Sequence, residues 1–293
     1  MTRRVSRRTF VVEGSRMAAG ALAATLVPAC RRKPDLAPPP VEATFADATI
    51  GSFASLQVAG GPREIGLLGG KRFGDAIRAS MERRADWWKG LKDFAAGEGK
   101  DAVAAFRKAS RKHAPRAFAE LEGWAEGSGV PLDDLLVMNV KCEIEELLKK
   151  RADAPKVEPH AGCSTVVLRE GGRLIHLHNE DGHDSCADLM FVMRARPDEG
   201  PAWVALCYPG ILPGNAPGVN DAGIAVTTNY IASREVKLGV GRYFLDRMIL
   251  ESSTLDEAVG WSTHPERSFA FHHVVTDLPG KRAKAVEVSV SAE

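Results

Sequence analysis

The sequence has little cysteine and almost no net charge. It contains five cysteines in 293 residues, and its formal net charge is +1. Apart from Cys30 and Cys163, the remaining three cysteines form an odd set without the spacing of a disulfide framework, so at most one bridge can join two of them. No basic patch, aromatic-interleaved groove or nucleic-acid motif is present, which argues against binding to nucleic acid.

The N-terminal region has no apolar run long enough to span a bilayer. The mostly apolar run from Met17 to Val27 has instead the length of a signal-peptide core, and the preceding S-R-R-T-F-V at residues 6–11 resembles a twin-arginine export motif. Cys30 directly follows an alanine at the end of this run and is the expected lipidation site. We therefore expect residues 1–30 to direct export, with the protein periplasmic or lipid-anchored on the outer face of the membrane.

The rest of the chain is expected to be globular. Residues 1–30 hold five arginines and one glutamate, so the other residues carry 34 basic and 37 acidic groups, a net charge of −3. With 44% hydrophobic residues, a chain of this length can bury a substantial core. The expected organisation is a tether and first strand region over residues 31–60, a helical segment over 61–162 and a β-rich catalytic segment over 163–293. No internal repeat is present.

Apolar periodicity supports this division. A spacing of three to four residues between apolar positions predicts helices between residues 72 and 150. Two later helices are expected over residues 242–251 and 255–263, and Thr254 with Glu257 forms the capping box of the second. Strands are expected over 163–168, 174–178, 189–194, 203–207, 224–230, 269–276 and 283–289.

The segment around Cys163 predicts a β-hairpin. C-S-T-V-V-L at 163–168 is rich in β-branched residues, and L-I-H-L-H at 174–178 alternates apolar and polar residues. If Gly171 and Gly172 form a two-residue loop, Glu170 pairs with Arg173, and Cys163 lies opposite position 180. Cross-strand neighbours have Cβ atoms roughly 5 Å apart, so N-E-D at 179–181 would lie beside the sulfur. A register shift of one residue would change which of the three groups is nearest.

Four motifs in this order resemble a known family. They are E-G-W-A-E-G-S-G-V-P-L-D-D-L-L-x-x-N at 122–139, A-G-C-S-T at 161–165, N-E-D at 179–181, and the segment from P-G at 209–210 to P-G-V-N-D-A-G-I at 217–224. Together they are similar to the acyl-coenzyme A:6-aminopenicillanate (isopenicillin N) acyltransferase-like family of N-terminal nucleophile cysteine hydrolases. The resemblance covers about residues 60 to 290 and implies an α+β fold, a four-layer αββα sandwich.

The resemblance also implies a mechanism. A precursor would cleave itself between Gly162 and Cys163, and the liberated cysteine would perform acyl transfer or amide hydrolysis on an acylated small molecule, with an acyl thioester as one possible class of donor. Asp181 would orient the new amine or bind substrate, and the side-chain amide of Asn220 would donate to the oxyanion. This chemistry requires no cofactor.

The chemistry is reasonable from the residues themselves. A thiol with an ordinary pKa of about 8.5 is a modest nucleophile at neutral pH, and a free α-amino group with a pKa of about 8 is a suitable general base for it. Before cleavage the same thiol could attack the carbonyl of Gly162. A residue without Cβ tolerates the strained backbone that this N-to-S acyl shift requires.

Simpler interpretations stay open for each of these residues. Cys163 could be a small buried hydrophobe, Glu180 and Asp181 could be solvated residues at a strand end, and Asn220 could serve only the turn before Gly223. At the level of function, the chain could be a noncatalytic homologue that binds an acylated ligand without turnover.

A metal site is a further alternative. The cluster contains ligands of the type that zinc prefers, and a metal-dependent hydrolase would use His176 and His178, which share a face of the strand. A metallo-β-lactamase-like arrangement would need aspartate at 180 and histidine at 181, so the spacing fails by one residue. The cluster consists of His176, His178, Glu180, Asp181, His183, Asp184 and Cys186.

The end of the sequence departs from the resemblance. Family members carry a further oxyanion asparagine downstream, in a motif similar to histidine-threonine-asparagine-histidine. Neither His272-His273 nor Thr228-Asn229-Tyr230 replaces that motif. We therefore expect either a C-terminally truncated sandwich or an oxyanion donor from elsewhere in the chain.

Overall fold

The structure, a computed structural model, describes residues 8–12, 53–150 and 162–291. Its helices are α1 (Pro62–Glu82), α2 (Ala85–Ala96), α3 (Lys100–His113), α4 (Pro115–Ser128), α5 (Leu132–Asn139), α6 (Lys141–Lys149), α7 (Arg242–Leu250) and α8 (Leu255–Ser262), with a short 3-10 turn η1 (Asp184–Cys186). Its strands are β1 (Arg8–Val12), β2 (Ala54–Gly60), β3 (Ser164–Glu170), β4 (Arg173–Glu180), β5 (Phe191–Pro197), β6 (Trp203–Cys207), β7 (Gly218–Asn220), β8 (Ile224–Asn229), β9 (Phe271–Asp277) and β10 (Arg282–Val288).

The strands form two sheets. A seven-stranded sheet has the order β10-β9-β8-β7-β6-β5-β2, and a three-stranded sheet has the order β1-β4-β3. All strand pairs are antiparallel except β2 with β5. A parallel pair needs a long crossover connection. Here the connection between β2 and β5 contains all of α1 to α6, so the strand that precedes the helical segment joins the sheet of the β-rich segment.

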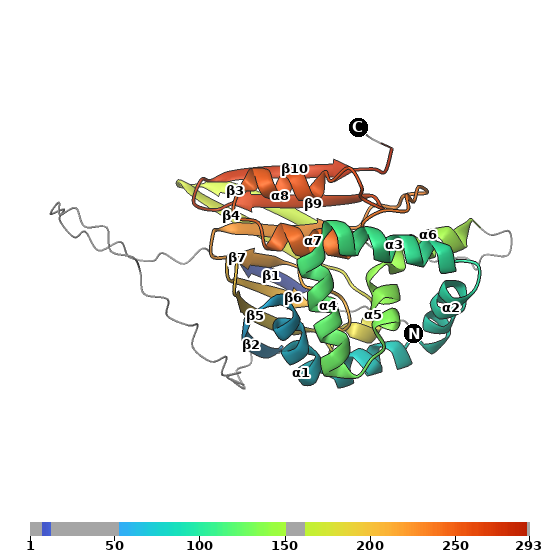
Figure 1. Cartoon of the computed structure of the whole chain (residues 1–293). Helices are drawn as coiled ribbons and strands as arrows, with labels where there is room; N and C mark the ends of the chain where they lie inside the picture. The colour runs from blue at the N-terminus through green and yellow to red at the C-terminus, as the bar shows by residue number, and fades with distance from the viewer. Residues whose placement is uncertain (1–7, 13–52, 151–161, 292–293) are drawn as a thin grey trace, which may run out of the picture.

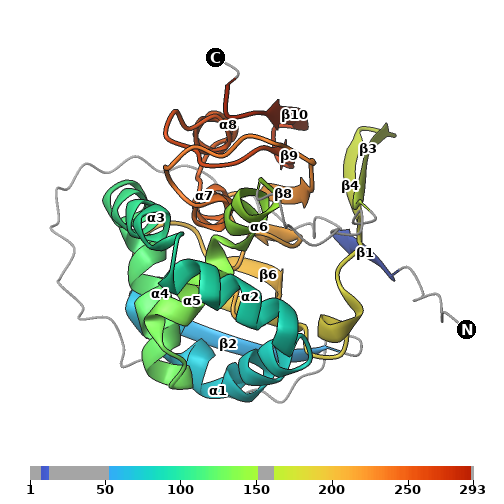
Figure 2. The ribbon, with the colours of Figure 1, turned by 90° about the vertical axis from the view of Figure 1, so that its right-hand side faces the viewer.

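Helices cover one face of the seven-stranded sheet, and the β3–β4 hairpin lies on the other (Figures 1 and 2). α1 packs against β2 and β5, while α7 and α8 pack against the C-terminal half of the sheet. Phe73 from α1 stacks on Phe191 from β5 with ring centroids 3.7 Å apart. The hydrophobic core draws on both segments of the chain, so neither segment buries its apolar surface alone.

α1 and α4 approach each other closely because glycines face each other along their contact. A Cβ atom at Gly66 would lie 2.0 Å from the carbonyl oxygen of Glu120, and one at Gly123 would lie 2.0 Å from that of Arg63. These backbones are therefore in direct contact, which no larger residue would permit.

The predicted hairpin register is confirmed. Glu170 pairs with Arg173 and Ser164 with Asn179, which sets Cys163 opposite Glu180. Gly171 and Gly172 have φ angles of 55° and 75°, as a type I′ turn requires. The two-glycine loop thus fixes which acidic residue lies beside the sulfur.

The predicted α+β class is confirmed, as are the two late helices and all the predicted strands to within three residues at each end. Thr254 accepts a hydrogen bond from the Glu257 N–H at the start of α8, as expected. The four-layer arrangement stays a prediction. The described ranges give helices, the large sheet and the three-stranded sheet, and the outer face of that small sheet exposes Val166 and Leu168.

Three elements were not predicted as observed. α1 begins at Pro62 rather than near residue 72, because its glycines interrupt the apolar pattern. β7 has only three residues, too few for a periodic signal. Residues 8–12, inside the predicted export signal, form β1 and pair with β4. Export itself stays a prediction, and Cys30 lies outside the described residues. Among the described helices, none is long and apolar enough to cross a membrane.

Candidate active site

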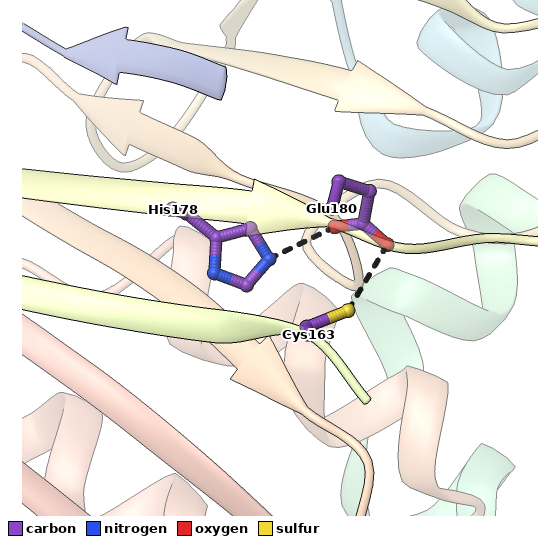
Figure 3. A group of neighbouring side chains, drawn as sticks. All are labelled: Cys163, His178 and Glu180. Carbon is purple, nitrogen blue, oxygen red and sulfur yellow. Dashed lines mark hydrogen bonds and ion pairs between the residues drawn. The ribbon is translucent and has the colours of Figure 1, made fainter. Parts of the chain in front are cut away.

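Cys163 lies immediately before β3, at the end of the hairpin opposite its tight turn. Its side chain is half-buried, and Sγ lies 3.8 Å from Glu180 Oε1 (Figure 3). The backbone N–H of Asp181 donates to Sγ at 3.4 Å. The preceding Gly162 is exposed, and a Cβ atom there would meet nothing within 4 Å. Among the residues that the structure describes, none therefore crowds the α-carbon of Gly162.

Glu180 is held in place by two further groups. The hydroxyl of Tyr208, just after β6, donates to Glu180 Oε1 at 2.7 Å. Nε2 of His178 lies 3.1 Å from Oε2, so both carboxylate oxygens have partners (Figure 3). The carboxylate nearest the sulfur is thus oriented by groups from two different sheets.

His178 is itself oriented by the contact between the two sheets. Its Nδ1 lies 2.8 Å from Thr165 Oγ1, and the same hydroxyl contacts Thr227 Oγ1 at 3.0 Å and donates to Asn229 Oδ1 at 3.2 Å. Thr165 lies on the same face of its strand as Cys163, because side chains alternate along a strand. A row of polar side chains between the two sheets therefore extends from Thr227 and Asn229 to the face of β3 that carries the thiol.

The pKa values describe an unreactive thiol in the uncut chain. Burial raises the pKa of Cys163 to about 12, with a further contribution from the negative charge of Glu180, and the Asp181 N–H offsets only part of this. Burial and the neighbouring Glu180 also raise the pKa of Tyr208 well above its usual range. Near neutral pH the thiol is protonated, so it needs a base before it can attack a carbonyl.

A pocket opens beside Cys163. Its walls include the aromatic side chains of Trp87, Tyr230 and Tyr243. Its lysine and arginine residues are Arg84, Lys141 and Arg242. The guanidinium of Arg84 stacks on the Trp87 ring at 3.7 Å from its centroid. Apolar walls with a few charged groups are typical of small-molecule sites.

Asn139 supports the same region. Its Nδ2 donates to the carbonyls of Leu135 and Gly210, each at 2.8 Å, and its Oδ1 accepts from the N–H of Leu212 at 2.9 Å. This buried side chain ties α5 to the loop that follows Tyr208. It therefore helps to position the phenol that contacts Glu180.

The structure does not bring Asn220 to the thiol. Its Nδ2 donates to the carbonyls of Leu250 at 3.0 Å and Ser252 at 2.7 Å, and its Oδ1 accepts from the N–H of Ile224 at 3.0 Å. These bonds use both amide hydrogens, which leaves none for an oxyanion. The turn interpretation therefore describes Asn220 in this structure, since its amide joins β7, the following turn and the end of α7.

Asp181 is adjacent to the thiol through its backbone rather than its carboxylate. The side chain is exposed and borders the pocket, while the N–H contacts Sγ. Glu180 instead provides the carboxylate nearest the sulfur. The alternation of the strand turns residues 178 and 180 toward Thr165 and Cys163, and residue 181 follows the end of β4.

The alternative metal site built on His176 and His178 is disfavoured by the contacts of His176. His176 lies 3.1 Å from Thr276 Oγ1 through Nδ1 and 2.9 Å from Thr227 Oγ1 through Nε2, and burial lowers its pKa to about 4. Both ring nitrogens are therefore occupied by hydroxyl groups. Within the described ranges, the side chains that could jointly hold a metal are Cys163, His178 and Glu180.

No local sequence pattern predicted that Tyr208 or the residues on the helical side would line the pocket. Tyr208 follows β6 and reaches the thiol only because the two sheets face each other. Trp87 and Lys141 come from helices distant in sequence. Thr165 could have been identified, since strand alternation places it on the same face as Cys163.

Comparison with known proteins found a family similar to the β-rich part of the chain. Residues 167–293 match the model of a family described as acyl-coenzyme A:6-aminopenicillanic acid acyl-transferase. This part of the chain is therefore similar to that acyltransferase family. The family match begins just after Cys163 and includes Glu180, Tyr208 and most of the seven-stranded sheet.

A curated relative of this chain is a hydrolase by its name. The chain is 27% identical over 155 residues to a beta-alanyl-dopamine/carcinine hydrolase from Drosophila melanogaster. The aligned region is 49% of this chain and 40% of that relative. The chain therefore spans well under half the length of the curated relative that it matches.

Proposed function

We propose that the chain is a self-processing cysteine amide hydrolase or acyltransferase that acts on N-acylated small molecules after cleaving itself between Gly162 and Cys163. One observation carries the proposal. A family-matched β-sheet domain places a half-buried cysteine next to a carboxylate whose two oxygens are both hydrogen-bonded, beside an aromatic pocket. The family name and the hydrolase relative both refer to acyl chemistry.

In the proposed cleavage, Glu180 acts as the base of the uncut chain. The thiol gives its proton to the carboxylate, and the sulfur attacks the carbonyl carbon of Gly162. The C–N bond to Cys163 then breaks, its nitrogen takes the proton, and a thioester joins Gly162 to the sulfur. Water hydrolyses this thioester and leaves Cys163 with a free thiol and a free α-amine. Glu180 is suited to this step because no α-amine exists before the cut.

After cleavage the new amine takes over as the base. It removes the thiol proton, the sulfur attacks the acyl carbonyl of the substrate, and the leaving amine takes the proton. Water completes hydrolysis, whereas an amine acceptor completes acyl transfer. The exposed carboxylate of Asp181 is proposed to hold the amine, because it adjoins Cys163 at the mouth of the pocket.

The substrate is proposed to be an amide of a small amine, or an acyl thioester in the transfer direction. The relative's name refers to two such small amides. Trp87 and Tyr230 would cover an apolar part of the substrate, while Lys141 would face an anionic one. Export by the twin-arginine route is proposed on the arginine pair and the apolar run of the sequence alone.

Intact-mass analysis of the purified chain tests self-cleavage. We expect two polypeptides, the second beginning at Cys163, and a single uncut polypeptide for Cys163→Ala. Cys186→Ala is the matched control, because Cys186 is also a free, half-buried thiol, in η1 just after the hairpin. An uncut native chain that hydrolyses acylated compounds and keeps this activity in Cys163→Ala would contradict the proposal.

A noncatalytic acyl-ligand-binding protein is the second candidate. It is favoured by the raised pKa of Cys163, which keeps the thiol unreactive in the uncut chain. This candidate predicts one intact polypeptide at every pH together with saturable binding of an acylated amine. Intact-mass analysis therefore distinguishes the two functions, since the enzyme predicts two polypeptides and the binding protein predicts one.

A further inference from the structure

Three different metal-ligand side chains meet at the mouth of the β3–β4 hairpin. Cys163, His178 and Glu180 each offer one ligand atom, and these atoms all lie within 4.8 Å of one another. Sγ is 3.8 Å from Glu180 Oε1, and His178 Nε2 is 3.1 Å from Glu180 Oε2 (Figure 3). The hairpin register supplies all three, because 178 and 180 share a face of β4 and 163 is the partner of 180.

These separations suit a zinc ion. Zinc binds sulfur at about 2.3 Å and nitrogen or oxygen at about 2.0 to 2.2 Å, so two ligands on a tetrahedral centre lie about 3.3 to 3.8 Å apart. The distances from Glu180 to the sulfur and to His178, 3.8 and 3.1 Å through its two oxygens, fall close to this range, and the sulfur and the histidine nitrogen lie within 4.8 Å of each other. Three protein ligands leave a fourth position for water.

The surroundings support the same assignment. Metal-bound histidines usually form a hydrogen bond through the other ring nitrogen. His178 has such a contact, because its Nδ1 lies 2.8 Å from Thr165 Oγ1, while its Nε2 faces the cluster. Tyr208 in turn orients Glu180. By contrast, His176 on the same strand has hydroxyl partners on both nitrogens and is unavailable.

The charge around the cluster also favours a cation. Glu180 and Asp181 are both acidic and adjoin the sulfur. Among the residues that the structure describes, no lysine or arginine forms an ion pair with Glu180, whose nearest ring partner is His178. Arg242 lines the same pocket and contributes positive charge near the sulfur, which Glu180 and Asp181 outnumber. A divalent cation would neutralise this site.

We propose that Cys163, His178 and Glu180 form a binding site for one divalent zinc-type cation, and that the bound cation suppresses self-cleavage. Binding replaces the thiol proton, which leaves to solvent, and forms a sulfur–metal bond. The sulfur lone pair needed to attack Gly162 is then shared with the metal, and Glu180 can no longer accept a proton. The suppression rests on the proposed self-cleavage, whereas the metal site does not.

Cobalt and zinc titrations of the full purified chain test the site. We expect one equivalent of Co²⁺ to give a sulfur-to-cobalt charge-transfer band in the near ultraviolet, which one equivalent of Zn²⁺ removes. Cys163→Ala should lose the band, and Glu180→Gln should weaken binding at least tenfold in competition with a chromophoric chelator. Near-UV circular dichroism checks that each variant is folded.

Two matched controls lie just outside the cluster. Cys186→Ala removes a second free thiol near the hairpin, and His183→Gln removes an exposed histidine whose Nδ1 accepts from the Ser185 N–H. Both should bind Co²⁺ like the parent chain. A charge-transfer band that survives in Cys163→Ala, or the absence of any such band in the parent chain, would overturn the proposed site.

A time course of cleavage separates this inference from the proposed function. We expect excess Zn²⁺ to slow the appearance of the chain beginning at Cys163 at least tenfold, and a chelator to restore the rate. If Co²⁺ binds as described but the chain is never cut, the metal site stands and self-cleavage fails. If cleavage proceeds equally with zinc and with chelator, or requires the metal, the suppression is wrong.

Discussion

At the scale of single residues, Glu180 rather than Asp181 places its carboxylate next to the thiol of Cys163. Its Oε1 is the carboxylate oxygen nearest Sγ, at 3.8 Å, and Tyr208 and His178 fix its orientation. The side chain of Asp181 is exposed and only its N–H contacts the sulfur. The two neighbouring carboxylates therefore have different surroundings, and the roles proposed for them can be tested separately.

Glu180→Gln should slow self-cleavage by about 100-fold or more, which is the usual contribution of a general base. The amide keeps the shape of the side chain and can still accept from Tyr208, but it cannot take the thiol proton. Asp181→Asn should change cleavage little and reduce substrate turnover instead. Denaturing gels sampled over time report the first rate. Equal cleavage rates in Glu180→Gln and the parent chain would exclude Glu180 as the general base of self-cleavage.

His176 is the residue that links this hairpin to acid stability. Burial depresses its pKa to about 4, below the unfolded value of about 6.5. A depressed pKa means that the neutral ring stabilises the fold fully above pH 6.5. This stability is lost as the pH falls from about 6.5 to about 4, and amounts to about 3 kcal/mol.

His176→Gln should be less stable than the parent chain at pH 7, since it alters both hydroxyl contacts, but its stability should fall less between pH 6.5 and 4. Urea unfolding at several pH values measures the difference. The parallel control is His272→Gln, which replaces a half-buried histidine that contacts Asn229. This variant should lose as much unfolding free energy between pH 6.5 and 4 as the parent chain does. Identical acid slopes for the parent and His176→Gln would exclude this role for His176.

At the scale of elements, the contact between α1 and α4 depends on glycine. A methyl group at Gly123 would lie 2.0 Å from a backbone oxygen of α1, so one helix would have to move. Overpacking a tight contact usually costs about 1 to 3 kcal/mol. Because α1 also packs against β2 and β5, its displacement would reach the edge of the large sheet.

Gly123→Ala should therefore lower the free energy of unfolding by about 1 to 3 kcal/mol. Gly90→Ala, in the exposed interior of α2, has nothing within 4 Å of the added methyl group and should raise it by about 0.5 to 1 kcal/mol through helix propensity. Thermal melts of both variants give the comparison. If Gly123→Ala raised the free energy of unfolding as Gly90→Ala does, helix propensity rather than the contact with α1 would determine the effect of residue 123.

The β3–β4 hairpin is the element that the sequence predicted best. Two consecutive glycines allow the positive φ angles of a type I′ turn, and the alternation of L-I-H-L-H fixes which face is buried. Register follows from these two local features alone. By contrast, β7 and the parallel pairing of β2 depend on neighbours that are distant in sequence, so no local pattern predicts them.

At the scale of the whole molecule, a buried ionic network joins the helical and β-rich segments. Arg247 on α7 donates to Glu120 on α4 at 2.8 Å and lies 3.5 Å from Glu251. Its guanidinium also stacks over Trp203 of β6 at 4.8 Å. Burial raises the pKa of Glu120, and the positive charge of Arg247 opposes this shift. Each charge is tolerated because the other is present.

Arg247→Met should lower stability at pH 7 by about 3 to 5 kcal/mol, because it leaves Glu120 buried without its cation. The pKa of Glu120 then rises further, so the penalty should shrink as the pH is lowered and the carboxyl takes up a proton. Denaturant unfolding at pH 7 and pH 5 measures this trend.

Two further variants complete the comparison. Adding Glu120→Leu to Arg247→Met should recover most of the loss, since no unpaired charge remains. Arg63→Met, which removes an exposed ion pair with Glu126, should cost less than about 1 kcal/mol. A double variant as unstable as Arg247→Met alone would show that lost packing over Trp203, rather than charge, sets the cost.

The sequence by itself determined the α+β class, the hairpin, its register and the placement of Cys163 beside an acidic residue, because each follows from alternation, helical periodicity or turn chemistry within a few residues. Only the tertiary structure decided that Glu180 is oriented by Tyr208, that His178 is held through Thr165, and that Asn220 joins β7 to α7 instead of reaching the thiol. These contacts join residues from different strands and helices. They depend on how the two sheets and the helices pack, which no local stretch of sequence encodes.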